Sequence, residues 1–379
     1  MRIGMISTYP PIECGIATYT QYLVEALRNR SLDVYVVGHL GGAGQQVFPV
    51  FDYEDDGLAE RAFSAMTRLT PDVVHVQHEF ALYGKHLGVN VVPLLIQFRL
   101  IGVPTVVTLH TVYRPVKRDH RILLENILVN TRAAIVHDPY QKEAIAQALG
   151  PDLASKVRVI PHGARLVTPD KDARRKLGLP DDRRILLLIG YFRPSKRFEL
   201  IVDLFPRILE RRPDALLVIA GKIRGREFIE YRDMLFDRIR RSPARNRIVL
   251  IRGQLAQETF DRILSAADVV ALPYQINSQS GILAHCLAFG KPVVTSDTES
   301  MRRTLAESGA GLVCRDEEDY LEAVTRLLGD DGYREELSRN ALAYVRNGIA
   351  WPLVAGTHAD LYRDLVGYQD LEPNILVVD

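Results

Sequence analysis

Short apolar runs alternate with helical stretches along this chain, and the alternation starts a second time near residue 185. The first set of predicted strands covers residues 3–7, 34–38, 73–77, 105–109, 133–136 and 157–160, separated by helical stretches such as 15–29. The second set covers residues 185–189, 215–220, 247–251, 269–272, 292–295 and 311–314, with helices such as 198–210 between them. Near-continuous apolar strands joined by helices indicate parallel sheets that are covered on both faces. The pattern therefore predicts an α/β protein with two doubly wound domains.

Length and composition agree with this division. A chain of 379 residues is longer than a single core usually supports. The segment 164–182 is rich in charge and contains Pro169 and Pro180, so we interpret it as the linker region. With 48 Lys and Arg against 47 Asp and Glu, the chain lacks the basic excess of a protein that coats nucleic acid. We expect no nucleic-acid partner.

The cysteines and the N-terminus indicate the compartment. Cys14, Cys286 and Cys314 are far apart and have no metal-ligand spacing, which suits a reducing environment. The start, MRIGMISTYPP, is a short apolar strand that soon meets a Pro-Pro turn, and no apolar run reaches membrane-spanning length. We expect a cytoplasmic protein.

The segment 269–297 reads strand, polar turn, helix, Gly-Lys-Pro break, strand. A strand that feeds directly into a helix leaves backbone N–H groups unpaired at the start of that helix. Ser278, Gln279, Ser280 and Gly281 are small or polar, so a phosphate oxygen could approach the main chain there. A serine that simply caps a helix, and a Gly-Lys-Pro that simply ends one, are the alternatives.

Cationic residues follow the first strand of the second set. The sequence Gly-Tyr-Phe-Arg-Pro-Ser-Lys-Arg at 190–197 places Arg193, Lys196 and Arg197 just before a helix. Ligands of open parallel sheets bind beyond the carboxyl ends of the strands. A guanidinium fork and a flexible ammonium at that position suit a diphosphate, and a solvated cationic turn is the alternative interpretation.

Polar residues also follow strands of the first set. Gly15 opens a helix after the first strand, and His110 follows the fourth. His75, His78 and Glu79 come at the end of the third strand and could be mistaken for a metal site. No further ligand follows at helical spacing, so we expect no metal and interpret these three residues as acceptor contacts or as simple polar packing.

Taken in order, these segments resemble the retaining GT-B glycosyltransferases of family 4, also called glycosyl transferases group 1. The resemblance extends over nearly the whole chain and includes Val-Ile-Pro-His-Gly at 159–163, Ser-Ala-Ala-Asp-Val-Val at 265–270 and Ala-Phe-Gly-Lys-Pro-Val-Val at 288–294. It implies two Rossmann-like domains that face each other across a cleft. Residues 1–164 would form the acceptor-side domain, joined by a returning C-terminal helix at about 349–379, and residues 165–348 would bind the nucleotide-sugar donor.

The resemblance also implies roles for single residues. Gly15 matches the glycine that lets the main chain approach the donor phosphate or the acceptor. His110 matches a histidine at the donor sugar, whose backbone or side chain stabilises the reacting centre. Arg193 and Lys196 match the basic pair that clamps the diphosphate, although Tyr191 replaces the commoner arginine, so Arg197 is an alternative second charge. The residues whose N–H groups would face the distal phosphate are Ser280, Gly281 and Ile282.

One departure from the family pattern concerns two glutamates separated by seven residues, which contact the donor sugar and the ribose. Asn277 and His285 stand in their places here, with Gln279 between them. Both can bond hydroxyls, but neither supplies a fixed negative charge. We therefore expect no glutamate nucleophile, and favour front-face departure with His110 and Asn277 at the reacting centre and a donor phosphate oxygen as the base.

The expected function is retaining transfer of a hexosyl group, mannose or glucose, from a nucleotide-diphosphate sugar to a glycan, lipid-linked or small-molecule hydroxyl. GDP-mannose is the favoured donor, and we expect no cofactor. A peripheral contact with the inner membrane face through the basic segment 114–121 is left open. The alternative function is a catalytically silent homologue that binds a nucleotide sugar or glycan as a partner subunit. A dehydrogenase is disfavoured because G-x-G-x-x-G is missing after the first strand.

Overall fold

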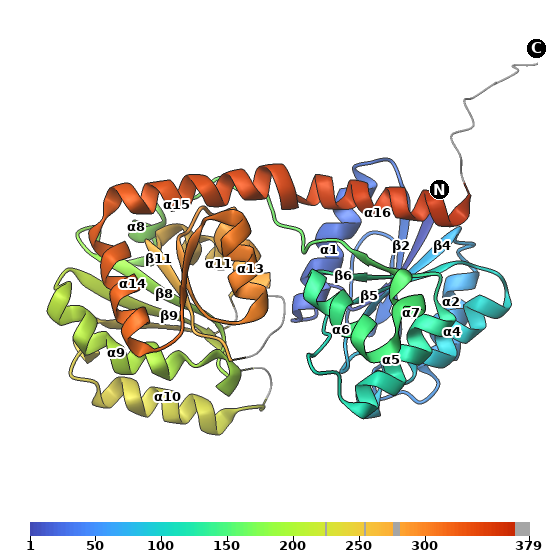
Figure 1. The fold of residues 1–379 in the computed structure, drawn as a ribbon, viewed down its shortest axis with the longest axis horizontal. Helices are drawn as coiled ribbons and strands as arrows, with labels where there is room; N and C mark the ends of the chain where they lie inside the picture. The colour runs from blue at the N-terminus through green and yellow to red at the C-terminus, as the bar shows by residue number, and fades with distance from the viewer. Residues whose placement is uncertain (224–225, 254, 276–280, 368–379) are drawn as a thin grey trace, which may run out of the picture. The chain divides into compact units, whose positions relative to one another are not determined.

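The computed structural model describes residues 1–223, 226–253, 255–275 and 281–367. The chain divides into two compact units. Unit 1 comprises Met1–Gly163 and Trp351–Asp379, and unit 2 comprises Ala164–Ala350. Each unit contains one parallel sheet with helices on its faces, so the predicted α/β class with two doubly wound domains is confirmed (Figure 1).

The sheet of unit 1 has seven strands in the order β3-β2-β1-β4-β5-β6-β7. Their bounds are β1 Arg2–Ser7, β2 Asp33–His39, β3 Val47–Phe51, β4 Val73–His78, β5 Thr105–Leu109, β6 Ala133–Val136 and β7 Val157–Val159. Successive residues of β1 serve opposite faces, because Met5 packs in the core layer that contains α1 and Ile6 in the layer that contains α2 and α4. Both faces are therefore buried, as the continuous apolar runs predict.

Helices cover both faces of this sheet. Their bounds are α1 Gly15–Arg28, α2 Leu58–Thr67, α3 Lys85–Gly88, α4 Val91–Leu100, α5 Arg118–Asn130, α6 Pro139–Leu149, α7 Pro151–Ser155 and α16 Trp351–Val366. Strand β3 is absent from the sequence prediction. It is an edge strand, it contains Pro49, and Phe48 is 40% exposed, so it lacks the buried apolar run that marks the central strands.

Helix α16 brings the end of the described chain back onto unit 1. Trp351 is buried against Tyr19 of α1, with their ring centroids 5.1 Å apart. A Cβ added at Gly163 would lie only 2.4 Å from the indole ring, so the backbone there passes directly over Trp351. Further along the helix, the hydroxyl of Tyr362 lies 2.6 Å from His75 Nδ1 in β4. The helix therefore completes the core of unit 1.

Unit 2 has a six-stranded sheet in the order β10-β9-β8-β11-β12-β13. The strands are β8 Arg184–Tyr191, β9 Ala215–Lys222, β10 Ile248–Arg252, β11 Val269–Leu272, β12 Val293–Ser296 and β13 Gly311–Cys314. The helices are α8 Ala173–Leu177, α9 Phe198–Arg211, α10 Ile229–Arg241, α11 Gln257–Ala266, α12 Gly281–Ala288, α13 Glu299–Ser308, α14 Glu317–Gly329 and α15 Asp331–Tyr344. Short helical turns η1 Pro194–Lys196, η2 Arg245–Arg247 and η3 Val345–Ile349 complete the unit.

The segment 164–182, interpreted above as a linker, is part of unit 2. Ala173 and Leu179 are buried in its core. The guanidinium of Arg174 donates to the carboxylate of Asp268 at 2.7 Å and to the carbonyl oxygen of Ala266 at 3.1 Å. The charge of Arg174, one of those that suggested a linker, is thus used in an ion pair and hydrogen bonds that fix the segment on the unit.

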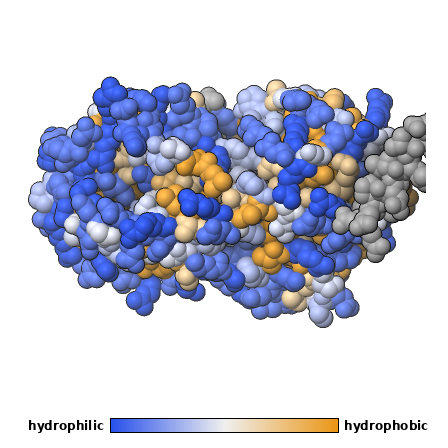
Figure 2. Space-filling view, turned by 90° about the horizontal axis from the view of Figure 1, so that it is seen from above, coloured by the Kyte–Doolittle hydropathy of each residue, from blue (hydrophilic) through white to orange (hydrophobic). Residues whose placement is uncertain are grey.

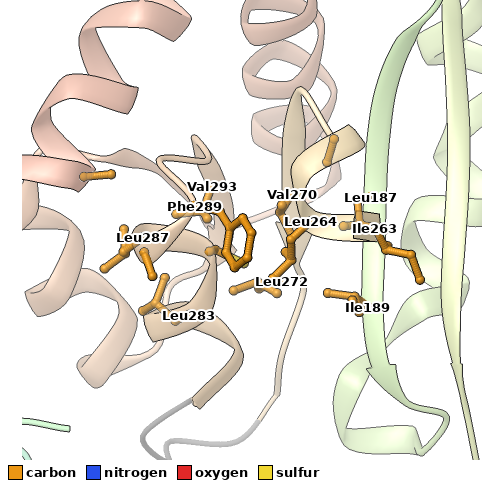
Figure 3. Packing of buried hydrophobic residues seen from close by; sticks show 14 of the residues in the cluster. Leu187, Ile189, Ile263, Leu264, Val270, Leu272, Leu283, Leu287, Phe289 and Val293 are labelled. Carbon is orange, nitrogen blue, oxygen red and sulfur yellow. The ribbon is translucent and has the colours of Figure 1, made fainter. Parts of the chain in front are cut away.

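The packing of α12 places the helix start beyond β11. The apolar helix fits between sheet and α15, and Leu283, Cys286 and Leu287 are buried. Among the side chains labelled in Figure 3, Leu283, Leu287 and Phe289 lie on one side of Val270 and Leu272, and Leu187 and Ile189 of β8 lie on the other. Lys291 of the Gly-Lys-Pro break donates to the carbonyl oxygens of Ser265 and Ala267, so this lysine has a structural role.

None of the helices in the described part of the chain is long and apolar enough to cross a membrane. The face drawn in Figure 2 is hydrophilic over most of its area, with hydrophobic residues gathered in smaller patches.

Candidate active site

The carboxyl ends of β8 and β11 are neighbours in the sheet of unit 2. Residues 192–197 leave β8 and residues 273–275 leave β11 at this same edge. The backbone N–H of Gln275 donates to the carbonyl oxygen of Ser195 at 3.0 Å, which ties the two segments together. Ligands of open parallel sheets bind at such an edge, so this tie forms the frame of a candidate binding site.

Lys196 is the central charge of this frame. Its ammonium lies 3.3 Å from the centroid of the Tyr274 ring, and within the described residues it makes no hydrogen bond or ion pair with a protein acceptor. The residue keeps part of its surface exposed, so a ligand can reach it. Burial of the group, and secondly the charge of Arg193, lower the pKa of Lys196 to about 7. A buried cation without an acceptor is a strong indication of an anion site.

Two arginines flank Lys196 in the sequence. Arg193 is exposed, and Arg197 adopts φ 48° at the point where α9 begins. Neither side chain forms an ion pair with a carboxylate of the described chain. The N–H of Phe198 at the start of α9 already bonds the hydroxyl of Tyr231 at 2.9 Å, so side chains rather than this helix start offer positive charge to a ligand.

The polar turn before α12 falls largely outside the described residues. Asn277, Gln279 and Ser280 all lie there, so their predicted roles stay predictions. Gly281 and Ile282 begin α12 and keep part of their surface exposed. His285 lies one turn further, with its ring 5.2 Å from that of Phe260 in α11. Of the predicted phosphate and ribose contacts, Gly281, Ile282 and His285 therefore belong to one helix turn beside β11.

In unit 1, Gly15 begins α1 after the loop that leaves β1. A Cβ added at this glycine would meet no protein atom within 4 Å. The fold of unit 1 itself does not require a glycine here, which agrees with a role in the close approach of a ligand.

His110 follows β5 and is held by unit 1 through both ring nitrogens. Its Nε2 lies 2.9 Å from Gln77 Oε1, and its Nδ1 lies 3.4 Å from His137 Nε2. The His137 Nδ1 in turn lies 3.0 Å from the carbonyl oxygen of Ile160. The Tyr19 ring packs edge-on against His110 at 4.8 Å. Burial, and then the neighbouring His137, lower the pKa of His110 well below its ordinary value, so the ring is neutral at physiological pH.

The predicted acceptor residues occupy different environments. His75 lies inside β4 with no exposed surface, and its Nε2 lies 2.7 Å from the hydroxyl of Thr108. It is therefore a packing residue and not an acceptor contact. His78 at the end of β4 is also buried, and burial lowers its pKa to about 4. Glu79 keeps part of its surface exposed, and its Oε2 accepts from the Thr111 hydroxyl at 2.6 Å, beside His110.

Sequence reasoning missed three residues that contact predicted site residues, one in unit 2 and two in unit 1. Tyr274 supplies the ring beneath Lys196, and Gln77 and His137 hold His110. His137 directly follows β6, and Tyr274 follows β11 after a single proline. Their positions at the ends of strands could therefore have indicated them. Among the residues with described placement, no group of three or more His, Cys, Asp or Glu could hold a metal ion.

Two family models together account for most of the chain. The model "Glycosyltransferase Family 4" matches residues 14–168, and "Glycosyl transferases group 1" matches residues 169–343. The chain therefore belongs to the family 4, group 1 glycosyltransferases, a class of enzymes with the GT-B fold.

Curated relatives agree with this family. The chain is 26% identical to the phosphatidyl-myo-inositol mannosyltransferase of Mycolicibacterium smegmatis, over 97% of this chain and 95% of that protein. It is 28% identical to a glycosyltransferase of Methanocaldococcus jannaschii, over 50% of this chain and 47% of the relative. The match to the D-inositol 3-phosphate glycosyltransferase of Nocardioides sp. is 26% identical over 69% of this chain and 62% of that protein. The chain thus spans only about half to two thirds of the length of some relatives that it matches.

Solved structures share the fold. Sucrose-phosphate synthase from Thermosynechococcus elongatus aligns with a TM-score of 0.80 at 20% identity, over 97% of this chain and 100% of that chain. Anabaena HepE in complex with UDP-glucose aligns with a TM-score of 0.75 at 16% identity, over 96% of this chain and 100% of that chain.

Proposed function

We propose that this glycosyltransferase moves a hexosyl group from a nucleotide-diphosphate sugar to a hydroxyl of a glycan, lipid-linked or small-molecule acceptor, with retention of configuration and without a metal ion. The observation that carries the proposal is the Lys196 ammonium, which lies at the carboxyl edge of the unit 2 sheet and has no acceptor among the residues that the structure describes. A diphosphate would supply the acceptor oxygens that this cation lacks.

The chemistry follows from these charges. When the bond between the sugar and the diphosphate breaks, negative charge develops on the leaving oxygen. Lys196 and Arg193 stabilise that charge, which is a task that a metal ion performs in other transferases. Without a glutamate at Asn277 or His285 to act as nucleophile, the acceptor hydroxyl attacks from the face that the diphosphate leaves. Its proton passes to a phosphate oxygen of the donor.

The donor sugar is mannose or glucose in this proposal, with GDP-mannose favoured over UDP-glucose. The named activity of the Mycolicibacterium smegmatis relative supports mannose. The complexes of Anabaena HepE with UDP and UDP-glucose support a uridine donor as the second choice.

Hydrolysis of a panel of nucleotide sugars tests the proposal. The purified chain is incubated with GDP-mannose, UDP-glucose and other donors, and the released nucleoside diphosphate is measured. We expect slow release from one donor, because water replaces the missing acceptor. Tight binding of a donor with no release, even after Asn277→Glu restores a carboxylate, would instead support the silent homologue.

A surface of unit 1 supports a lipid-linked acceptor. Helices α4 and α5 pack side by side, and Arg99 near the end of α4 donates to the carbonyl oxygen of Val129 in α5. The α4–α5 surface exposes Leu100 by 79%, Ile101 by 52% and Ile122 by 51%. Three exposed cations lie beside Ile122 at the start of α5, and within the described chain none of them forms an ion pair. They are Lys117, Arg118 and Arg121, with the exposed Asp119 among them.

We infer a peripheral contact with anionic lipid at this surface, since apolar side chains and unpaired cations together suit a lipid headgroup region. The double variant Lys117→Gln, Arg121→Gln is expected to bind phosphatidylglycerol vesicles about 30-fold more weakly, at about 1 kcal/mol for each cation. Vesicle sedimentation measures this. The matched control is Arg240→Gln, Arg241→Gln on α10, where both arginines pair with Asp237. Equal loss in both variants, or no binding of the unmodified protein, would contradict the inference.

A further inference from the structure

Tyr274 and Lys196 form a pair that the family resemblance does not assign. Tyr274 stands two residues beyond β11 and is 4% exposed, and the Lys196 ammonium lies 3.3 Å from the centroid of its ring. The hydrogen bond from the N–H of Gln275 to the carbonyl oxygen of Ser195 joins the neighbours of both residues. The pair is therefore fixed at two points, by the backbone tie and by the ring contact.

The ring is the one favourable partner that the protein gives this ammonium in the described part of the chain. A desolvated cation is attracted to the negative face of an aromatic ring, and the attraction grows as water is excluded. The ammonium group keeps its hydrogens available, because a ring face takes up charge without a directed acceptor. A phosphate oxygen can therefore bond the ammonium without first breaking an ion pair.

We propose that Tyr274 is a positioning residue, whose ring holds the Lys196 side chain charged and in place for the donor diphosphate. The ligand's identity in this statement rests on the proposed function, whereas the pairing of ring and ammonium does not. Tyr274 itself need not touch the donor, and its effect reaches the ligand through Lys196.

The pairing has a consequence for pH. Burial disfavours the charged form of Lys196. The positive charge of Arg193, on the same loop, disfavours it further. From the β11 side, the Tyr274 ring favours the charged form. Because the pKa of Lys196 in the empty protein is about 7, part of the population is neutral at slightly alkaline pH. Donor binding then requires proton uptake, so affinity falls by about tenfold per pH unit above that pKa, until the pKa in the complex is passed.

The first experiment needs no ligand. Lys196 is labelled by reductive methylation with isotopic formaldehyde at several pH values, and its rate, which follows the neutral fraction, is read by mass spectrometry. Tyr274→Phe keeps the ring and is expected to leave the midpoint unchanged. Tyr274→Leu and Tyr274→Met remove the ring and are expected to lower the midpoint by about one pH unit. Two aliphatic variants are used, with the thermal midpoint as a check that each is folded.

An unchanged Lys196 midpoint in a folded aliphatic variant would overturn the inference. The second experiment measures binding of an intact nucleotide sugar between pH 6 and 9, a range in which its diphosphate diester does not titrate. Affinity should begin to fall at lower pH in Tyr274→Leu than in the unmodified protein, and Lys196→Arg should remove the pH dependence. If no nucleotide sugar binds, the proposed function fails, and the labelling experiment still decides the role of Tyr274.

Discussion

Replacement of Lys196 with Ala is expected to weaken nucleoside diphosphate binding by about 10- to 150-fold, which corresponds to about 1.5–3 kcal/mol for a hydrogen bond to a charged group. The reason is that the ammonium has no protein acceptor in the described chain, so its hydrogen-bonding capacity is available to the ligand. Titration calorimetry with GDP and UDP measures the change directly.

A second substitution at Lys196 should weaken diphosphate binding but stabilise the empty protein. Lys196→Met removes the charge and keeps the length of the side chain, so it should weaken binding as Ala does. It should also raise the thermal midpoint of the empty protein, because a largely desolvated ammonium with no acceptor among the described residues is destabilising. Lys171→Ala, at an exposed lysine of unit 2, is the matched control and should change neither quantity. Unchanged diphosphate affinity in Lys196→Met would remove Lys196 from the site.

Replacement of His110 with Ala is expected to lower kcat by about 100-fold while donor affinity stays nearly constant. The ring fills the space between Gln77 and His137 and packs on Tyr19, so its loss releases the backbone that follows β5. Both nitrogens already have partners inside unit 1, and for this reason we expect a loss of positioning rather than of diphosphate binding. Steady-state kinetics and donor calorimetry separate the two.

The control for His110 is His86→Asn. His86 is an exposed histidine of unit 1 with φ 56°, a conformation that Asn tolerates. This variant should retain the turnover and the donor affinity of the unmodified protein. If His110→Ala retains its turnover as well, or if it loses donor affinity in proportion to kcat, the assignment of His110 to the reacting centre is wrong.

Periodicity alone predicted most of the fold. The central strands are continuous apolar runs buried on both faces, so their signal is strong. The sequence prediction missed strand β3, because an edge strand with Pro49 and an exposed Phe48 has no such apolar run. The segment 164–182 was misinterpreted for a different reason: its charges pair with distant residues, as Arg174 does with Asp268, and such pairing depends on the tertiary fold.

The candidate site was predictable where it depends on the ends of strands. Arg193, Lys196 and Gly281 follow strands, and their chemistry could be inferred from residue type and position. The contact of Lys196 with Tyr274 and that of His110 with His137 join residues far apart in the sequence, so no local pattern indicates them. For His75 the sequence left acceptor contact and polar packing open, because nothing local indicated that Tyr362 of the returning helix would lie against it.

The central claim is transfer of a sugar from a nucleotide donor that Lys196 holds. Its most direct test is mass spectrometry of products from the purified chain, isotopically labelled nucleotide sugars and a panel of hydroxyl acceptors that includes mannosides, glucosides, inositol phosphate and phosphatidylinositol. The account predicts an acceptor heavier by one labelled hexose from one donor, and a product formed at least about 10-fold more slowly by Lys196→Ala at limiting donor. A protein that binds the donor yet gives neither transfer nor hydrolysis, or a Lys196→Ala variant that forms product at the unmodified rate, would contradict it.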